Sequence, residues 1–192
     1  SWIGFEEVKF FGYTCRHNNY EVSKDKLEAF EKLPCPTNIK QARSALGMGV
    51  MFASFIPHYS TTAAPISDMT KKNFSWNKNT WSTPDYYSLK FAEFISAIKG
   101  ASTLFFPDYT MTWILRTDAS LLGVAAVLLQ HTAEEPDVLQ PIGIVSKKFT
   151  DQAMKWPTIE QEAYGIFFGV YSFSYLLRGK EFTIETDHNN LR

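Results

Sequence analysis

Residues 113–118 read Trp-Ile-Leu-Arg-Thr-Asp, and residues 182–187 read Phe-Thr-Ile-Glu-Thr-Asp. Both runs end in an apolar residue, a charged residue, threonine and aspartate, and both favour an extended backbone. Residues 158–177, between them, have the spacing of a helix. Strands joined through a helical crossover are usually parallel neighbours, so we expect Asp118 and Asp187 side by side at the carboxyl edge of one sheet. Open α/β sheets bind their ligands at that edge.

The two aspartates predict a metal site. Adjacent carboxylates raise the pKa of one of the pair, unless a divalent cation lies between them. Mg²⁺ is the natural candidate because it prefers carboxylate oxygens and keeps part of its water shell. The alternative is that Asp118 and Asp187 are ordinary turn residues, since strands often end in turns and aspartate is common there.

Composition indicates a globular chain without a strong overall charge. The 192 residues are 45% hydrophobic and 16% aromatic, which is enough to fill one large or two small cores. Because 19 basic residues balance 20 acidic ones, a nucleic-acid partner would have to be held by local basic clusters. Cys15 and Cys35 form neither a metal-type pair nor a disulfide framework, which favours a reducing, intracellular compartment. The longest aliphatic run, residues 124–129, is too short to span a bilayer, and the abrupt ends are those expected of a fragment.

The first 72 residues predict a hairpin followed by a small helical module. A strand is expected over residues 8–13, with residues 20–22 as its partner across a polar turn at residues 16–19. Ser23 and Asn38 are candidate helix N-caps. Helices are expected over residues 24–33, over 39–47 with a continuation through 48–56, and over 63–72.

Seven basic residues are scattered over these helices. If several of them share a face they could contact phosphates, and the alternative is that they belong to solvated helix surfaces. They are Lys24, Lys26, Lys32, Lys40, Arg43, Lys71 and Lys72.

The remaining residues predict a mixed sheet with helices, an α+β or α/β fold. Residues 73–81 break the helical periodicity and are interpreted as a linker or hairpin that docks through Trp76 and Trp81. An antiparallel meander, a crossover helix and a parallel strand are expected to follow. The predicted elements are a helix over 86–99, strands over 113–118, 124–129, 141–145 and 182–187, a turn at 119–123, and the helix over 158–177.

The crossover helix contains two candidate acids in its first turns, where acids also complement the helix dipole. Its expected core stripe is Ile159, Ala163, Ile166, Phe167 and Val170. Glu160 and Glu162 fall on opposite sides of that stripe. Glu162 shares its side with two glycines, Gly165 and Gly169, which would allow a close approach, yet periodicity does not choose between the glutamates.

A series of ordered motifs in the second half resembles one family, the ribonuclease H domain of gypsy-type LTR-retrotransposon reverse transcriptases. His188 follows Asp187 as it does in that family, although a lone histidine in a loop is more often a surface residue than a catalytic one. The motifs are Thr117-Asp118-Ala119-Ser120, residues 123–130, Pro141-Ile142, Ser146-Lys147-Lys148-Phe149, residues 158–162, residues 175–180 and Thr186-Asp187-His188.

Upstream motifs extend the resemblance over nearly the whole chain. Residues 10–13 resemble the primer-grip strand of such a polymerase, and they make Gly12 and Tyr13 candidate nucleic-acid contacts, as Lys40 and Arg43 are in the helical module. The implied domains are the last hairpin of a polymerase palm (1–23), a helical thumb-like module (24–72), a bridge (73–110) and a partial ribonuclease H-like domain (111–192). The thumb motifs are at 33–38, 46–47, 55–57 and 64–66, and the bridge motifs at 74–76 and 107–109.

The resemblance implies an endonuclease that hydrolyses the RNA strand of an RNA/DNA hybrid. Its catalytic and metal-binding residues would be Asp118, Glu162 and Asp187, and the family register is what selects Glu162. Two Mg²⁺ ions, with Mn²⁺ as a substitute, would activate the attacking water and stabilise the leaving oxygen. The expected partners are an RNA/DNA hybrid or primer-template and the rest of a polyprotein, or another chain that completes the nuclease fold, in the cytoplasm, a retroelement particle or the nucleus.

Departures from the family pattern lower the expected activity of this chain. A fourth catalytic acid and the last strand and helices of the fold belong downstream of Arg192, and the paired aspartates of the polymerase belong upstream. Ser54 also replaces the arginine usual before the Phe-Ile-Pro motif. We therefore expect weak or no cleavage by the chain alone and no DNA synthesis. The alternatives are a non-catalytic nucleic-acid-binding or scaffolding subunit, and a retroelement-derived host protein that makes only protein contacts.

Overall fold

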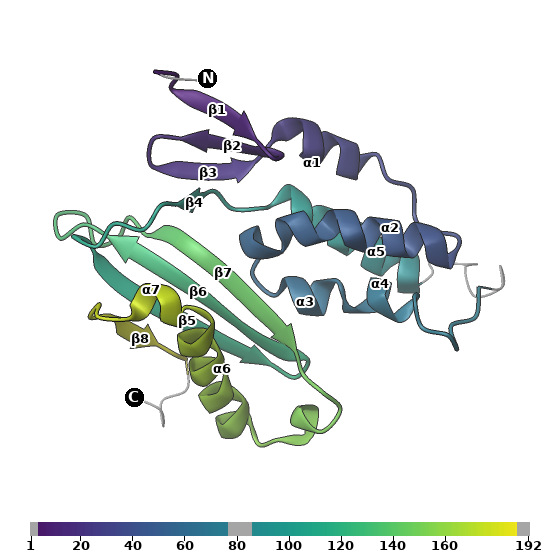
Figure 1. Cartoon of the computed structure of the whole chain (residues 1–192). Coiled ribbons are helices and arrows are strands. Elements are labelled where there is room, and N and C mark those ends of the chain that lie inside the picture. Colours follow the sequence, from purple (N-terminus) through teal and green to yellow (C-terminus); the bar gives the residue numbers. More distant parts are fainter. Residues whose placement is uncertain (1–3, 77–85, 188–192) are drawn as a thin grey trace.

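The computed structural model describes residues 4–76 and 86–187 (Figure 1). In these residues the chain forms two four-stranded sheets and a group of helices. The mixed helical and sheet architecture predicted from the sequence is confirmed. Trp81 and His188 lie outside the described residues. Within the described part, no helix is both long enough and apolar enough to cross a bilayer.

The first sheet is entirely antiparallel and contains one more turn than predicted. The expected strand over residues 8–13 is broken at Phe11 and Gly12, whose positive φ angles of 47° and 86° reverse the chain. Tyr13 therefore begins a second strand, and the predicted turn at 16–19 shrinks to His17-Asn18. In spatial order the strands are β1 (Glu7–Phe10), β2 (Tyr13–Arg16), β3 (Asn19–Val22) and β4 (Leu104–Phe105).

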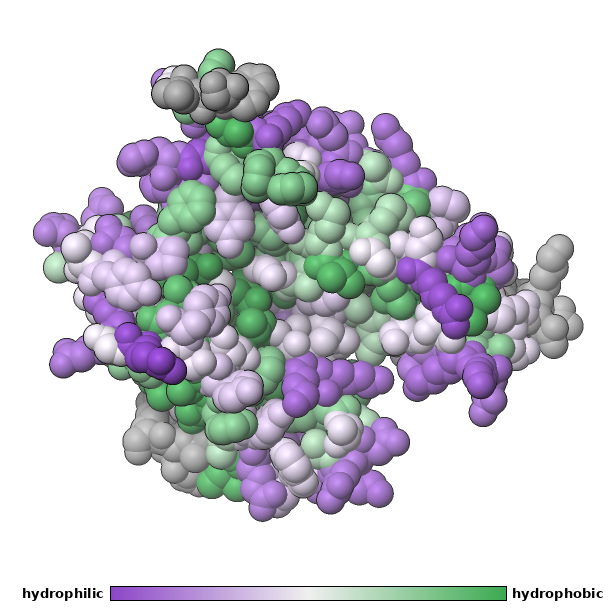
Figure 2. All heavy atoms as spheres, in the orientation of Figure 1, coloured by the Kyte–Doolittle hydropathy of each residue, from purple (hydrophilic) through white to green (hydrophobic). Residues whose placement is uncertain are grey.

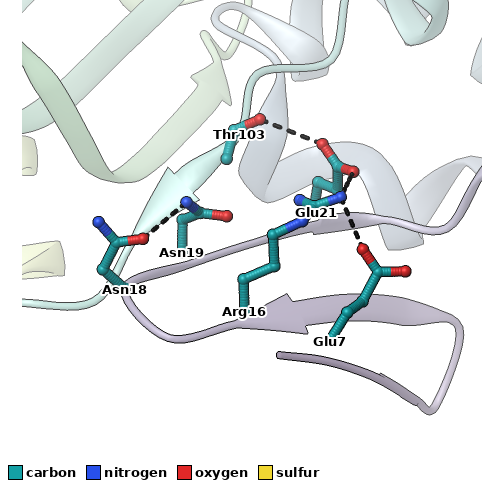
Figure 3. A network of polar contacts seen from close by, with 6 residues as sticks. All are labelled: Glu7, Arg16, Asn18, Asn19, Glu21 and Thr103. Atoms are coloured by element: carbon teal, nitrogen blue, oxygen red, sulfur yellow. Dashed lines mark hydrogen bonds and ion pairs between the residues drawn. The ribbon is translucent and has the colours of Figure 1, made fainter. Parts of the chain in front are cut away.

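Ion pairs join the strands of the first sheet (Figure 3). The Arg16 guanidinium on β2 lies 3.1 Å from a Glu7 oxygen on β1 and 2.8 Å from a Glu21 oxygen on β3. The hydrogen bond from Arg16 also lowers the pKa of the Glu21 carboxyl. Thr103, directly before β4, donates its hydroxyl to Glu21 at 3.3 Å. The segment that leads into the second sheet is thereby tied to the N-terminal strands.

The helical module follows the prediction in outline. The Asn38 side chain caps the second helix by accepting the backbone N–H of Gln41 at 3.0 Å. The expected continuation over 48–56 is a 3₁₀ helix. The expected helix over 63–72 is shorter and ends at Asp68, and Pro65, which lacks an N–H, lies in its first turn. The elements are α1 (Lys24–Glu31), α2 (Ile39–Gly49), η1 (Val50–Phe55), α3 (Tyr59–Thr62), α4 (Ala64–Asp68) and α5 (Tyr86–Lys99).

The second sheet has the predicted topology, with the strand order β7-β6-β5-β8. The parallel register of β8 on β5 pairs Leu115 with Ile184. The meander is tighter than predicted, because Ser120 pairs with Gly123 and only Leu121-Leu122 remain as the turn. The strands are β5 (Thr112–Ser120), β6 (Gly123–His131), β7 (Gln140–Lys148) and β8 (Thr183–Glu185).

The crossover helix, α6 (Thr158–Ser172), buries a different face from the one predicted. Of the expected core stripe, Ile159 is 40% exposed and Phe167 is 61% exposed. The buried face contains Glu162 and the two glycines instead. A Cβ atom on Gly169 would lie 2.9 Å from the Ala126 Cβ, so the absent side chain lets the helix lie directly on the sheet. The side of α6 that contains Gly165 and Gly169 is therefore its packing surface, and the element that approaches these glycines closely is the sheet.

Two short helical segments flank α6. They are η3 (Ala153–Lys155) before it and α7 (Ser174–Leu177) after it. The helix predicted over 158–177 is thus divided at Phe173.

On the face of the molecule shown in Figure 2, apolar and weakly polar side chains cover the middle, whereas hydrophilic side chains gather at the periphery.

The other face of the second sheet packs against the helical module. Ile144 on β7 is buried in one apolar cluster with Phe52, Phe55 and Phe94 of the helices. The backbone N–H of Ser60, in α3, also donates to the Ser146 hydroxyl of β7 at 2.9 Å. The helical module and the mixed sheet thus share a hydrophobic core.

Candidate metal site

Three acids that are far apart in the sequence meet at one edge of the second sheet. Asp118 lies near the end of β5 and Asp187 two residues after β8, and continuing the pairing of Arg116 with Glu185 by two residues places the aspartates side by side. Glu162 reaches them from the first turns of α6. Each residue offers a carboxylate oxygen within 4.8 Å of the others. The structure therefore brings together all three residues that the resemblance selected.

Glu162 is the buried member of this cluster. The residue is only 3% exposed, and its Oε2 atom has no hydrogen-bond partner among the described residues. Burial raises the pKa of the Glu162 carboxyl, and the nearby Asp187 and Asp118 raise it further. A hydrogen bond from the Ala119 backbone opposes this shift. An unpaired oxygen in such surroundings costs about 1–3 kcal/mol, which a bound cation would offset.

The donor set fits a hard divalent cation. Asp118 and Asp187 are exposed and Glu162 is buried, so a cation in the cluster would be accessible from one side and enclosed on the other. Carboxylate oxygens favour Mg²⁺, Mn²⁺ or Ca²⁺ over the softer metals. The cluster thus has both the ligand type and the concentration of carboxylates of a cation site.

A groove of about 710 Å³ opens beside the aspartates. It contains a cross-strand ion pair in which Arg116 donates its Nε to Glu185 at 2.8 Å. Both side chains are about half exposed, so the guanidinium remains accessible to a ligand in the groove. The lining residues are Arg116, Thr117, Asp118, Ile184, Glu185, Thr186 and Asp187.

One contact of the cluster was not predicted from the sequence. His58, from the helical module, places its Nε2 atom 2.9 Å from the Asp118 Oδ2 atom. No periodicity or motif links two residues that are 60 positions apart. Only the packing of α3 against the sheet brings them together.

Sequence comparison identifies the part of the chain that contains the cluster. Residues 108–192 match the family described as "RNase H-like domain found in reverse transcriptase". This segment is an RNase H-like domain of the reverse-transcriptase type. The fold class and the retroelement resemblance predicted above are both confirmed.

The RNase H-like domain and the residues before it are similar to retrotransposon Pol polyproteins. The Pol polyprotein from transposon 297 of Drosophila melanogaster is 28% identical over 191 residues, which cover 97% of this chain and 17% of that protein. The Tf2-3 polyprotein of Schizosaccharomyces pombe is 26% identical over 187 residues, which cover 96% of this chain and 14% of that protein. The chain thus spans less than a fifth of either relative.

Solved structures share the fold of the RNase H-like domain together with the preceding elements. The foamy viral protease-reverse transcriptase in complex with RNA/DNA hybrid has a TM-score of 0.73 and 18% identity, over 97% of this chain and 25% of that one. Its dRH form in complex with double-stranded DNA has a TM-score of 0.75 and 18% identity, over 93% and 30%. These likenesses cover both sheets and the helical module.

The predicted nucleic-acid contacts lie outside the RNase H-like domain and away from the acid cluster. Gly12 forms the β1–β2 turn, and the Tyr13 ring stacks on Phe55 at a centroid distance of 5.7 Å. Lys40 and Arg43 are exposed on α2. Their role in binding nucleic acid stays a prediction.

Proposed function

We propose that the acid cluster binds divalent cations and serves the hydrolysis of the RNA strand in an RNA/DNA hybrid. Asp118, Glu162 and Asp187 would be the metal ligands and the catalytic residues. The main support is the buried Glu162 carboxylate, whose Oε2 atom has no hydrogen-bond partner among the described residues and which lies within 4.8 Å of two exposed aspartates. A folded protein retains such a charge cluster at a cost in stability, which a functional cation explains.

Two Mg²⁺ ions, or Mn²⁺ in their place, would activate a water molecule and stabilise the leaving oxygen when bound at this cluster. The residues of the chain hold and orient the site. The backbone N–H of Ala119 orients the Glu162 carboxylate, and the contact of α6 with the sheet excludes water from its buried side. Arg116, in the groove beside the aspartates, is suitably placed to contact a substrate phosphate.

We assign the rest of the chain to the reverse-transcriptase part of a retroelement polyprotein that acts inside the cell. Residues 1–23 would be the last hairpin of a palm, 24–72 a thumb-like module, 73–110 a bridge and 111–192 the nuclease part. A hybrid or primer-template would contact Gly12, Tyr13, Lys40 and Arg43. The foamy viral protease-reverse transcriptase, which shares the fold, forms complexes with an RNA/DNA hybrid and with double-stranded DNA, and this supports the proposed class of partner.

Metal binding by the 192-residue chain tests the proposed site directly. Titration with Mn²⁺, followed by electron paramagnetic resonance, should show binding that Asp118→Asn weakens by more than tenfold. The family pattern has four catalytic acids and the cluster contains three, so the unaltered chain should cut a labelled RNA/DNA hybrid slowly. Asp118→Asn should not cut it. Equal Mn²⁺ binding by the unaltered chain and Asp118→Asn would contradict the proposal.

A second candidate function is nucleic-acid binding without cleavage. Its support is the β1–β2 turn, where Phe10 is 61% exposed and Phe11 is 81% exposed, because exposed aromatic rings can stack on bases. Hybrid binding that ignores Mg²⁺ and survives Asp118→Asn would favour this function. Loss of hybrid affinity in Phe11→Ala, with Mn²⁺ binding unchanged, would locate that surface.

A further inference from the structure

The backbone of His58 is held in a fixed, uncommon conformation. Its φ of 58° and ψ of 22° lie in the left-handed region, which few residues other than glycine, asparagine, aspartate and histidine adopt. The His58 carbonyl accepts the backbone N–H groups of Thr61 and Thr62 at 3.0 and 3.1 Å, and both threonine hydroxyls at 2.8 and 3.2 Å. These contacts fix the direction in which the imidazole leaves the chain.

The strand register explains why this imidazole meets the acid cluster. Asp118 pairs with Ala125, and Ala125 pairs with Ser146, so the three residues form one row on the same face of the sheet. The backbone N–H of Ser60 is bonded to Ser146 at one end of the row. His58, two residues earlier, contacts Asp118 at the other end. The start of α3 therefore lies across the row.

We propose that His58 is a positioning residue for the metal site, and that docking of the helical module thereby raises the cation affinity of the RNase H-like domain. This inference rests on the metal site proposed above. The Asp118 side chain is 56% exposed, and the His58 Nε2 atom, 2.9 Å from its Oδ2, restrains the orientation of the carboxylate. The contact engages one of the two carboxylate oxygens. Groups that orient metal ligands in this way typically change metal affinity by about 10–100-fold when they are removed.

The contact also gives the helical module a role at a site on another part of the fold. Glu162 approaches the cluster from α6, on one face of the sheet, and His58 approaches from the helical module on the other. Asp118 lies between them. The cation site is thus built by two layers of the molecule, and its affinity depends on both being in place.

The test measures Mn²⁺ affinity of the full chain by electron paramagnetic resonance. His58→Asn keeps a residue that tolerates the left-handed backbone but is too short to restrain Asp118 as the imidazole does. We expect its Mn²⁺ affinity to fall by about 10–100-fold. Ser146→Ala is the matched control, since it removes the hydrogen bond between α3 and β7 and leaves His58 and Asp118 unchanged. We expect its Mn²⁺ affinity to stay within about twofold of the unaltered chain.

Thermal melting in EDTA separates positioning from a structural role. The two variants should melt close to the unaltered chain, while only His58→Asn loses Mn²⁺ affinity. Unchanged or tighter Mn²⁺ binding by His58→Asn would overturn this inference and leave the proposed metal site standing. An equal loss in Ser146→Ala would overturn it as well, because module docking alone would then explain the effect. Absence of Mn²⁺ binding by the unaltered chain would overturn both proposals.

Discussion

Replacing Glu162 with glutamine tests the electrostatics of the acid cluster without any substrate. In EDTA the buried carboxylate is repelled by Asp118 and Asp187, whose oxygens lie within 4.8 Å. At an effective dielectric constant of about 20, each neighbour at that distance contributes about 3.5 kcal/mol of repulsion. Both aspartates are exposed, so solvent screening leaves about 1–2 kcal/mol in total. Glutamine has the same shape and removes this repulsion, which predicts a melting temperature about 3–6 °C higher in EDTA.

The same substitution should have the opposite effect when a cation is present. Glutamine is a poorer ligand than carboxylate, so the melting temperature of Glu162→Gln should rise less on addition of Mn²⁺ than that of the unaltered chain. Glu160→Gln is the matched control, because Glu160 is exposed two residues earlier on the same helix. Its substitution removes an equal charge and weakens only a favourable interaction with the helix dipole. Lower stability of Glu162→Gln in EDTA would refute the reasoning.

The repulsion on the Glu162 carboxylate also predicts how the stability of the chain changes with pH. The pKa of the Glu162 carboxyl is raised in the folded state above its ordinary 4.5, so the folded state binds more protons than the unfolded state over that interval. This contribution to stability is fully present below pH 4.5 and is lost as the pH rises through the folded-state pKa. In EDTA, the stability gap between Glu162→Gln and the unaltered chain should therefore widen above pH 4.5. Urea unfolding at a series of pH values measures this gap.

Four further substitutions test the fold. Gly169→Ala should destabilise the chain by about 1–3 kcal/mol, because the new Cβ would lie 2.9 Å from the Ala126 Cβ, whereas Gly47→Ala, with open space around it in α2, should stabilise it by about 0.5–1 kcal/mol. Urea unfolding measures the stability of both glycine variants, and a change of the same sign in the two would contradict this packing. Asn38→Ala should cost about 1 kcal/mol through loss of the N-cap of α2, and melting unchanged by it would argue against that cap. Arg116→Ala should cost at most about 1 kcal/mol, since its ion pair with β8 is half exposed, and a loss above 2 kcal/mol would show that this pair is not solvent-screened.

The sequence predicted the features that depend on local patterns. The helical crossover at residues 158–177 predicted that β5 and β8 are parallel, and the repeated Thr-Asp ending of the two strands then placed Asp118 beside Asp187, because strand pairing converts sequence position directly into spatial position. The chain reversal at Gly12 was missed, because the residues on both sides of it favour an extended backbone.

The features that depend on tertiary packing were missed. The predicted stripe on α6 was wrong because the hydrophobic period points to Ile159 and Phe167, while the sheet contacts the glycine face. A glycine adds little to an apolar pattern, although its lack of a side chain decides which face of the helix can lie closest to the sheet. The His58 contact with Asp118 is of the same kind, since it follows from how α3 docks on β7 and from no property of the two residues alone.

The burial of Ile144 among the phenylalanines of the helices bears on how the protein can be dissected. In a recombinant piece limited to residues 108–192, β7 would lack the helices that cover it, and its apolar side chains would be exposed to water. Such a piece should self-associate or need detergent, even with its acids intact. Work on the RNase H-like domain in isolation would therefore require polar replacements along that strand, or co-expression with the helices that normally cover it.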